Sequence, residues 1–330
     1  MNPDEVAEVR AELEAFVEDV FASLPRADQR SKGNLYLRGL MLDGRRKSMQ
    51  PMGERLGVDY QQLQQFVSAS PWKVEPVRRR LAGLAVETIQ PEAWVIDDTG
   101  FKKDGTSSPC VARQYSGTLG KIGNCQIGVS VHAATDAASC PLGWRLFVPE
   151  AWDDTCADSN DAAATIQARR EKAKIPDAVR HRTKWALALE MIDELGTWGH
   201  RPPVVAADAG YGEITAFRLG LQERGIPFVL AVKATTSAHP ASAIPESPQA
   251  TGVGRPSQAR YRDKPSSLRE LSTAVGSYSF TAAFTPANVE NYLTSSSDAV
   301  AFSPVLLRLE VSRYTFDCYE VPRPLLEGSL

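Results

Sequence analysis

The sequence predicts an α/β protein, built on a mixed sheet flanked by helices and preceded by an all-helical N-terminal region. Apolar residues recur at helical spacing through the first 90 residues. From Trp94 the pattern changes to short apolar runs of the kind that form buried strands. Between residues 184 and 234, helical segments and short apolar runs alternate, which is how the parallel part of a sheet is built.

The N-terminal region, residues 1–90, should contain several helices. Asn2 can cap a first helix that runs to about Leu24, and a second helix is expected over residues 34–42. Arg78 and Arg79 fall on a later helix.

A helix-turn-helix rhythm follows within this region. It consists of a helix, a turn at Gly57, a cap at Asp59 and a second helix over Gln61–Ser68, and Arg45, Arg46 and Lys47 stand in front of it. An ordinary helical hairpin that packs on its neighbours fits the same pattern, so both interpretations remain open.

The central region, residues 91–275, should form the sheet. Strands are expected in AWVIDDTGF, VARQYSGTL, CQIGVSVHAAT and LGWRLFVP, with a loop over 117–123, then in PPVVAADAG and PFVLAVKA. Helices are expected over 184–195 and 213–224. Three strands, a helical section and then strand–helix–strand is the order of an RNase H-like mixed sheet.

Two segments should lie outside that sheet. Residues 235–265 are rich in Pro, Ser, Ala and Gly, and they indicate a long loop or insertion arm. Residues 276–330 contain no Lys and show weak periodicity, so they form a divergent tail with one expected strand at Val305–Val311.

Composition argues against several classes of protein. The five cysteines and four histidines are scattered without a C-x-x-C pair, so an ordinary zinc site is not expected and the cysteines should be reduced and mostly buried. No apolar run reaches membrane-spanning length, and the charged N-terminus lacks the apolar stretch of a signal peptide. We therefore expect a cytoplasmic protein.

Charge is unevenly distributed although the formal net charge is only −3. Between Arg26 and Arg80 there are 12 lysines and arginines against five acidic residues, and a second basic stretch follows at 255–264. A basic stretch of this kind favours contact with phosphates, and a solvated protein face is the alternative.

Two apolar runs that are far apart in the sequence each end in acidic residues. These are Asp97 and Asp98 in WVIDDTGF, and Asp208 in VVAADAGYG. The carboxyl ends of neighbouring parallel strands meet at one edge of a sheet, and carboxylates held together there repel each other unless a cation separates them. Mg²⁺ prefers such oxygen ligands. Strand-end or helix-capping aspartates are the simpler interpretation of either motif alone.

Several blocks jointly resemble one family of enzymes. WVIDDTGFKKDG, VARQYSGTLGKIGNCQIGVSVH, CPLGWRLFVPEAW, PPVVAADAGYG and YRDKPSSLREL look like the DDE transposases of the insertion sequence 701 family, related to the insertion sequence 4 group. The segment RRKSMQPMGERLGVDYQQLQQFV resembles the N-terminal region of that family, and the similarity covers roughly residues 1–275.

The resemblance implies an RNase H-like catalytic core that uses Mg²⁺ (or Mn²⁺) to cut DNA at insertion-sequence ends and to transfer strands into target DNA. Asp98 matches the first catalytic acid, with Asp97 as its neighbour and possible substitute, and Asp208 matches the second. Asp98 and Asp208 would be metal ligands. The helical region 1–90 would bind DNA or mediate dimerisation, and the protein would be nucleoid-associated.

Basic residues at several positions are candidates for contacts with DNA phosphates. A solvated side chain is the alternative interpretation for Lys233, at the end of PFVLAVKA, and for the arginines near residue 78. The candidates are Arg45, Arg46, Lys47, Arg78, Arg79, Lys233, Arg260, Arg262 and Lys264.

The sequence departs from the family pattern in one respect. The family's third acid is a Glu within a Y-x-x-R-x-x-x-E-x-x-x-x-x-x-K type of block, and this block is missing here. Glu290, Glu310, Glu320 and Glu327 lack the surrounding pattern. We therefore expect a C-terminally truncated or frameshifted transposase with impaired activity. The alternatives are a catalytically inactive DNA-binding remnant or inhibitor, and a metal nuclease that takes its third acid from the tail.

Overall fold

The computed structural model describes residues 2–239, 243, 246 and 261–270. The chain divides into two compact units. The first comprises residues 1–88 with Trp198–His200, and the second comprises residues 89–197 with the described residues from Arg201 onward. Each unit is described by itself.

The first unit is helical, as expected. Its helices are α1 (Pro3–Val20), α2 (Ala27–Met41), α3 (Met49–Leu56), α4 (Tyr60–Ser68) and α5 (Val74–Ile89). A capping box between Asn2 and Glu5 starts α1. The core of the unit holds Val17, Val20, Phe21, Leu24, Phe66 and Val77. Phe66 stacks on Trp72 with ring centroids 5.1 Å apart.

The helix pair α3–α4 is present with the turn that the sequence predicts. Gly57 ends α3 at φ +67°, which a residue with a side chain rarely adopts, and the Asp59 side chain accepts a hydrogen bond of 2.9 Å from the Gln61 amide. α4 buries Leu63 and Phe66. Its outer side chains, which are exposed, are Tyr60, Gln61, Gln64, Gln65, Val67 and Ser68.

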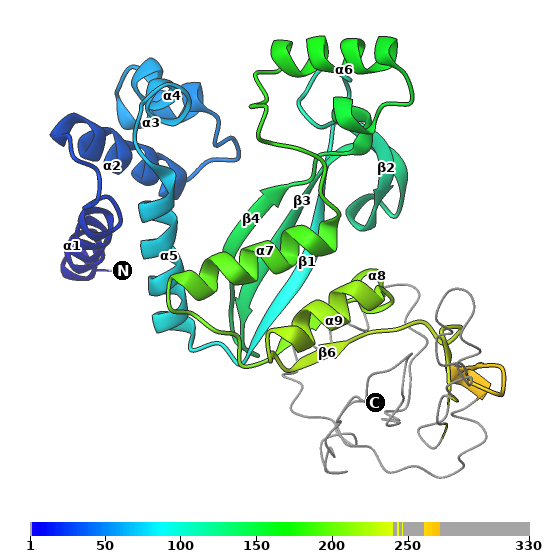
Figure 1. The fold of residues 1–330 in the computed structure, drawn as a ribbon. Helices are drawn as coiled ribbons and strands as arrows, with labels where there is room; N and C mark the ends of the chain where they lie inside the picture. The colour runs from blue at the N-terminus through cyan, green and yellow to red at the C-terminus, as the bar shows by residue number, and fades with distance from the viewer. Residues whose placement is uncertain (1, 240–242, 244–245, 247–260, 271–330) are drawn as a thin grey trace. The chain divides into compact units, whose positions relative to one another are not determined.

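The second unit is built on a mixed sheet (Figure 1). Its strands are β1 (Ala93–Lys102), β2 (Ala112–Ser116), β3 (Lys121–Ala134), β4 (Ser139–Leu146), β5 (Val205–Ala207) and β6 (Phe228–Leu230). The order is β2-β3-β1-β5-β6, and β4 also pairs with β3. β1 runs antiparallel to β3 and parallel to β5, which runs parallel to β6. In this arrangement β1 is central, with the antiparallel β3 on one side and the parallel β5 and β6 on the other, as in an RNase H-like sheet.

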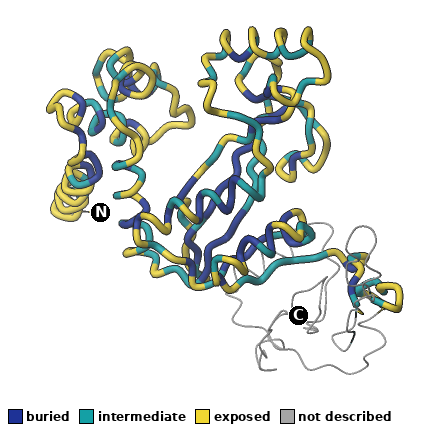
Figure 2. The backbone as a smooth tube through the Cα atoms, viewed as in Figure 1, coloured by how far each residue is buried: buried dark blue, intermediate teal, exposed yellow. Residues whose placement is uncertain are grey.

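Helices cover one face of this sheet. α7 (Lys184–Thr197) contacts β3, β4 and α9 (Thr215–Glu223), and it buries Leu187, Met191 and Leu195. Figure 2 shows the buried residues running along β1, β3 and α7. Burial of these apolar side chains fixes the sheet and α7 as one rigid body.

The chain between β4 and α7 forms an insert that contains α6 (Asn160–Lys172) and buries both apolar and polar side chains. Trp152 is fully buried, and the Arg169 guanidinium lies 3.5 Å from its ring centroid. Arg170 is also buried and donates to the Trp152 carbonyl at 2.7 Å and the Val179 carbonyl at 2.6 Å.

Asp153 in the same insert is a buried carboxylate. Burial by itself raises its pKa, but hydrogen bonds from the His181 and Thr155 amides, the Thr155 hydroxyl and the Arg180 guanidinium outweigh that effect and lower the pKa to about 2. The insert is therefore held by satisfied buried polar groups as well as by apolar packing.

Several boundaries differ from the sequence prediction. α2 begins at Ala27 instead of residue 34, and α1 ends at Val20. The expected loop 117–123 is shorter, because a 3-10 turn at Gly117–Leu119 leads directly into β3 at Lys121. β5 and β6 have three residues each, because Asp208 already caps the next helix and β6 pairs only opposite β5.

Other predictions fall partly or wholly outside the described residues. The arm 235–265 is described only at its two ends and at residues 243 and 246. At its start, β7 (Ser237–Ala238) pairs with β8 (Ser266–Ser267), which follows the arm. The tail 276–330, its expected strand and Cys318 lie outside the described residues. Of the other cysteines, Cys110 and Cys125 are buried and Cys156 is exposed. No helix in the described ranges is long and apolar enough to cross a membrane.

The backbone of α8 (Ala209–Gly212) passes very close to the backbone that follows β6, and this close packing can be tested. A Cβ added at Gly212 would lie 1.8 Å from the Ala231 carbonyl oxygen. We expect Gly212→Ala to lower the free energy of unfolding by about 1–3 kcal/mol, because backbone cannot move aside as a flexible side chain does.

Gly196→Ala is the matched control, because Gly196 also lies in a helix and a Cβ there would meet nothing within 4 Å. We expect this control to leave the free energy unchanged or to raise it by up to ~1 kcal/mol. Urea unfolding of both variants measures the difference. Equal stability of the two variants would contradict the close packing of α8 against the end of β6.

Candidate active site

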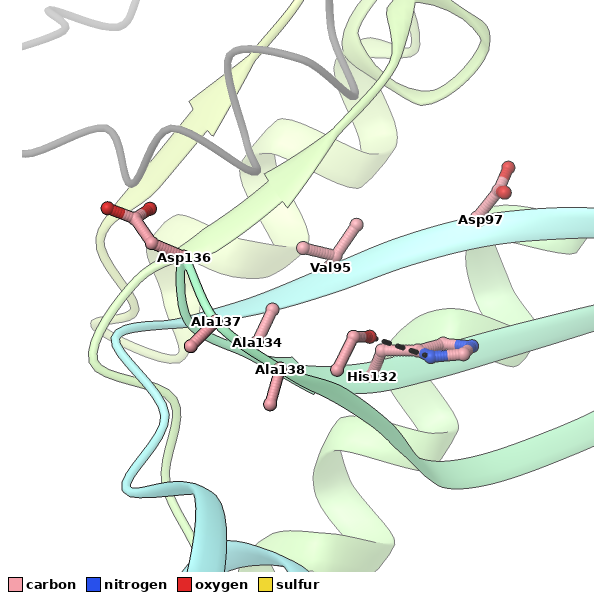
Figure 3. A pocket seen from close by; sticks show the side chains of 8 residues that line it. Val95, Asp97, His132, Ala134, Asp136, Ala137 and Ala138 are labelled. Atoms are coloured by element: carbon pink, nitrogen blue, oxygen red, sulfur yellow. Dashed lines mark hydrogen bonds between the residues drawn. The ribbon is translucent and has the colours of Figure 1, made fainter.

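The first pair of acids lies where β1 leaves the core. Residues 93–96 of this strand are buried, and Asp97 and Asp98 are half-buried. Side chains alternate along a strand, so the two acids face opposite sides of the sheet. Asp98 faces the side covered by α7, as do Trp94 and Ile96, whereas Asp97 projects from the same face as Val95 (Figure 3).

The second acid lies at the end of the neighbouring strand. Ile96 of β1 is in register with Ala207 of β5, so Asp208 follows at the same edge as Asp97 and Asp98. The Asp208 side chain caps α8 by accepting from the Gly210 amide at 2.9 Å and the Tyr211 amide at 3.4 Å. Asp208 is therefore a capping residue, as the simpler interpretation held, and it also lies beside the other acids.

Asp208 lies close enough to Asp97 and Asp98 for their charges to act on it. Burial is the main cause that raises the pKa of Asp208, and the negative charges of Asp97 and Asp98 raise it further. The amides of Gly210 and Tyr211 oppose this rise. The structure thus brings Asp208 near two acids that lie about 110 residues earlier in the sequence.

Two residues that the sequence analysis did not single out hold Asp98. The Lys184 ammonium at the start of α7 lies 2.5 Å from Asp98 Oδ2, and the Tyr211 hydroxyl donates to Asp98 Oδ1 at 2.5 Å. Burial and the charge of Asp98 raise the pKa of Tyr211, which keeps its hydroxyl a donor. Tyr211 stands inside the DAGYG motif, which was its only signal in the sequence.

Tyr211 is itself fixed in place. Its ring is buried and packs against Phe217 of α9, with ring centroids 5.5 Å apart. The buried Arg218 donates to the Gly212 carbonyl and, at 3.0 Å, to the Thr215 hydroxyl, which ties α8 to α9. The hydroxyl that reaches Asp98 therefore comes from a rigid support.

Asp97 belongs to different surroundings. It lines a depression of about 360 Å³ with Val95, His132 and Asp136 on the face of the sheet opposite Asp98 (Figure 3). Burial lowers the pKa of His132, whose ring nitrogens lie 3.1 Å from the Ser130 hydroxyl and 3.3 Å from that of Ser139. Of Asp97, Asp98 and Asp208, only Asp97 lines this depression.

The donor chemistry at this edge fits a divalent cation. Carboxylate oxygens are the ligands that Mg²⁺ and Mn²⁺ prefer, and burial together with the charges of Asp97 and Asp98 disfavours the charged form of Asp208. In the described part of the chain, no three acidic, histidine or cysteine side chains already converge on one point. Asp98 would have to exchange a present partner, Lys184 or Tyr211, for an ion.

The predicted basic contacts lie at separate places. Arg45 and Arg46 are exposed before α3, whereas Lys47 donates to the Leu42 carbonyl. On α5, Arg79 is exposed and the Arg78 guanidinium lies 5.3 Å from the Trp198 ring centroid.

In the second unit, Lys233 pairs with Glu213 at 2.8 Å, and Arg262 and Lys264 are exposed. Arg260 lies outside the described residues.

Neutralising Asp208 should stabilise the protein. Asp208→Asn keeps a good capping side chain but removes a charge that burial and two neighbouring acids disfavour. Because the folded-state pKa is raised, the charged form costs stability once the pH has risen through that pKa. At pH 7 in EDTA we expect a melting temperature about 2–4 °C higher, and the gain should disappear below about pH 4.

Asp59→Asn is the control, since Asp59 caps α4 in the same way on an exposed surface. Its melting temperature should not change. A less stable Asp208→Asn protein at pH 7 would contradict the mutual repulsion of the three acids.

Comparison with known proteins agrees with the family resemblance seen in the sequence. A family model described as DDE superfamily endonuclease matches residues 19–288. A probable transposase for insertion sequence element IS701 from Microchaete diplosiphon is 29% identical over 199 residues, which cover 59% of this chain and 47% of the relative. The chain thus spans about half the length of this curated relative. The resemblance seen in the sequence is confirmed, and the chain belongs to the DDE superfamily endonucleases.

Proposed function

We propose that this chain acts on DNA as a transposase-type endonuclease that cuts at insertion-sequence ends and transfers strands into target DNA. The observation that carries the proposal is that β1 runs parallel to β5 and places Asp98 and Asp208 just beyond the paired residues of the two strands, where the charges of Asp97 and Asp98 act on Asp208. Open α/β sheets bind ligands beyond the carboxyl ends of their parallel strands. Membership of the endonuclease superfamily supports phosphodiester chemistry at this position.

Asp98 and Asp208 would hold Mg²⁺ or Mn²⁺, and Asp97 would add negative charge beside them. A divalent ion held there would activate the water or 3′-hydroxyl that attacks the phosphodiester, and it would stabilise the oxygen that leaves. The chain's own residues orient the acids: the amides of α8 fix Asp208, and Tyr211 fixes one oxygen of Asp98. The two acids are thereby held before DNA arrives, which lowers the cost of ordering them.

We further propose that the 330-residue chain cuts slowly. Asp98 and Asp208 would supply the first two acids of the family triad, and Glu290, Glu310, Glu320 and Glu327 lie outside the described residues. Two carboxylates can hold one ion, whereas a second ion normally needs another acid. The alternative is a DNA-binding remnant or inhibitor without cleavage. It is favoured by the present pairing of both Asp98 oxygens with Lys184 and Tyr211.

The α3–α4 pair is the proposed DNA-binding element of the helical unit. Gln61, Gln64 and Gln65 are exposed on α4, and glutamine amides can hydrogen-bond to base edges in the major groove. Arg45 and Arg46 are exposed before α3 and would contact phosphates. A homodimer that brings two such elements to paired ends, and association with the nucleoid, are parts of the same proposal.

The cleavage proposal is tested by incubating the chain with supercoiled plasmid that carries the element's ends. We expect slow nicking that requires Mn²⁺ or Mg²⁺ and that Asp208→Ala reduces at least about 100-fold, because the variant loses a cation ligand. Asp104→Ala is the control, since the Asp104 side chain is 99% exposed and lies beyond the end of β1. Specific binding to the ends with no nicking by the parent chain would favour the inactive remnant instead.

The DNA-binding proposal is tested by salt titration of binding to the same ends. Arg45→Ala and Arg46→Ala should each weaken binding and reduce the slope of log K against log salt by about 1, because each removes one phosphate contact. Arg10→Ala on α1 removes an exposed arginine from an acidic helix and should change neither quantity. Unchanged slopes in the Arg45 and Arg46 variants would exclude these two phosphate contacts.

A further inference from the structure

We propose that Lys184 is a positioning residue that acts as an internal counter-ion for Asp98 and weakens the binding of divalent cations until it is displaced. This inference rests on the proposed function, because it requires that Asp98 is a cation ligand. It goes further by naming the residue of this chain that competes with the cation.

Both oxygens of the Asp98 carboxylate already have a partner. Lys184 Nζ lies 2.5 Å from Oδ2, and the Tyr211 hydroxyl donates to Oδ1 at 2.5 Å. The two partners differ in kind, because Tyr211 is neutral and fixed in the core, whereas Lys184 carries a charge on a flexible side chain. A divalent cation on Asp98 would therefore compete with Lys184, and Tyr211 could keep its place.

The position of Lys184 in its helix indicates a specific role. Lys184 is the first residue of α7, and no acidic residue stands in the first turn of that helix. The N-terminal end of a helix carries partial positive charge, so a lysine there is unfavourable unless an anion offsets it. Asp98 supplies that anion across 86 residues of sequence.

The surroundings of Lys184 favour a strong contact over a solvated one. The side chains of Lys184 and Asp98 are only 32% and 26% exposed. The ammonium also lies 5.6 Å from the Phe147 ring centroid, and its charge acts on the buried Cys125 thiol. An ion pair shielded in this way is screened less than a surface pair, so its loss should change the charge balance at Asp98.

The experiment is a calorimetric titration of the full chain with Mn²⁺ in the absence of DNA. We expect Lys184→Met, which keeps most of the apolar side chain, to bind Mn²⁺ about tenfold more tightly than the parent chain. Lys184→Arg should bind with an affinity near that of the parent, because it restores the positive charge. Lys233→Met is the matched control: it breaks the Lys233–Glu213 pair of the same unit and should leave the affinity unchanged.

Melting temperatures provide the second readout. In EDTA we expect Lys184→Met to melt below the parent chain, and Mn²⁺ should raise its melting temperature by more than it raises that of the parent. Lys184→Gln carries the same predictions and is used if Lys184→Met does not fold. A purely structural ion pair would lower the melting temperature in EDTA and leave Mn²⁺ affinity unchanged, which would overturn the inference.

The titration also separates this inference from the proposed function. If Asp98→Asn abolishes Mn²⁺ binding while Lys184→Met binds no more tightly than the parent chain, the competition by Lys184 is refuted and the cation site stands. If neither the parent chain nor the Lys184 variants bind Mn²⁺, both proposals are refuted.

Discussion

The parallel pairing of β1 with β5 is the constraint on which the rest of the second unit depends. The register that sets Ile96 beside Ala207 brings Asp208 next to the stretch of β1 that carries Asp97 and Asp98. Burial raises the pKa of Asp208 there, and the charges of Asp97 and Asp98 raise it further. The neighbouring elements offset this cost locally: the amides of α8 cap Asp208, and Lys184 of α7 neutralises Asp98. The strand pairing that brings the acids near one another is therefore also the reason why the charged form of Asp208 is disfavoured.

Apolar packing behind the strands makes this arrangement possible. Trp94 and Ile96 are fully buried under the apolar face of α7, and α8 approaches the end of β6 so closely that Gly212 leaves no room for a side chain. Packing of this density holds polar groups in geometries they would not adopt in water. The insert between β4 and α7 uses a different means, because buried hydrogen bonds to Arg170 and Asp153 fix it.

Much of the fold was predictable from the sequence, because buried strands and amphipathic helices leave periodic patterns. The start of α2 was missed since its first turns, from Ala27 to Asn34, contain almost no apolar residue. The site was predictable where an acid ends an apolar run. Lys184 and Tyr211 were not, because their contacts with Asp98 span 86 and 113 residues and leave no local pattern. Only the folded sheet brings them together.

The alternation of side chains along β1 has a consequence for the adjacent acids Asp97 and Asp98. They are neighbours in sequence but face opposite sides of the sheet. For one to stand where the other stands, β1 would have to slide by a single residue, which would move Trp94 and Ile96 to the opposite face of the sheet, where the smaller Ala93 and Val95 now pack. The doublet is thus not a spare copy of one group: each carboxylate is committed to its own side of the sheet by the hydrophobic residues that precede it.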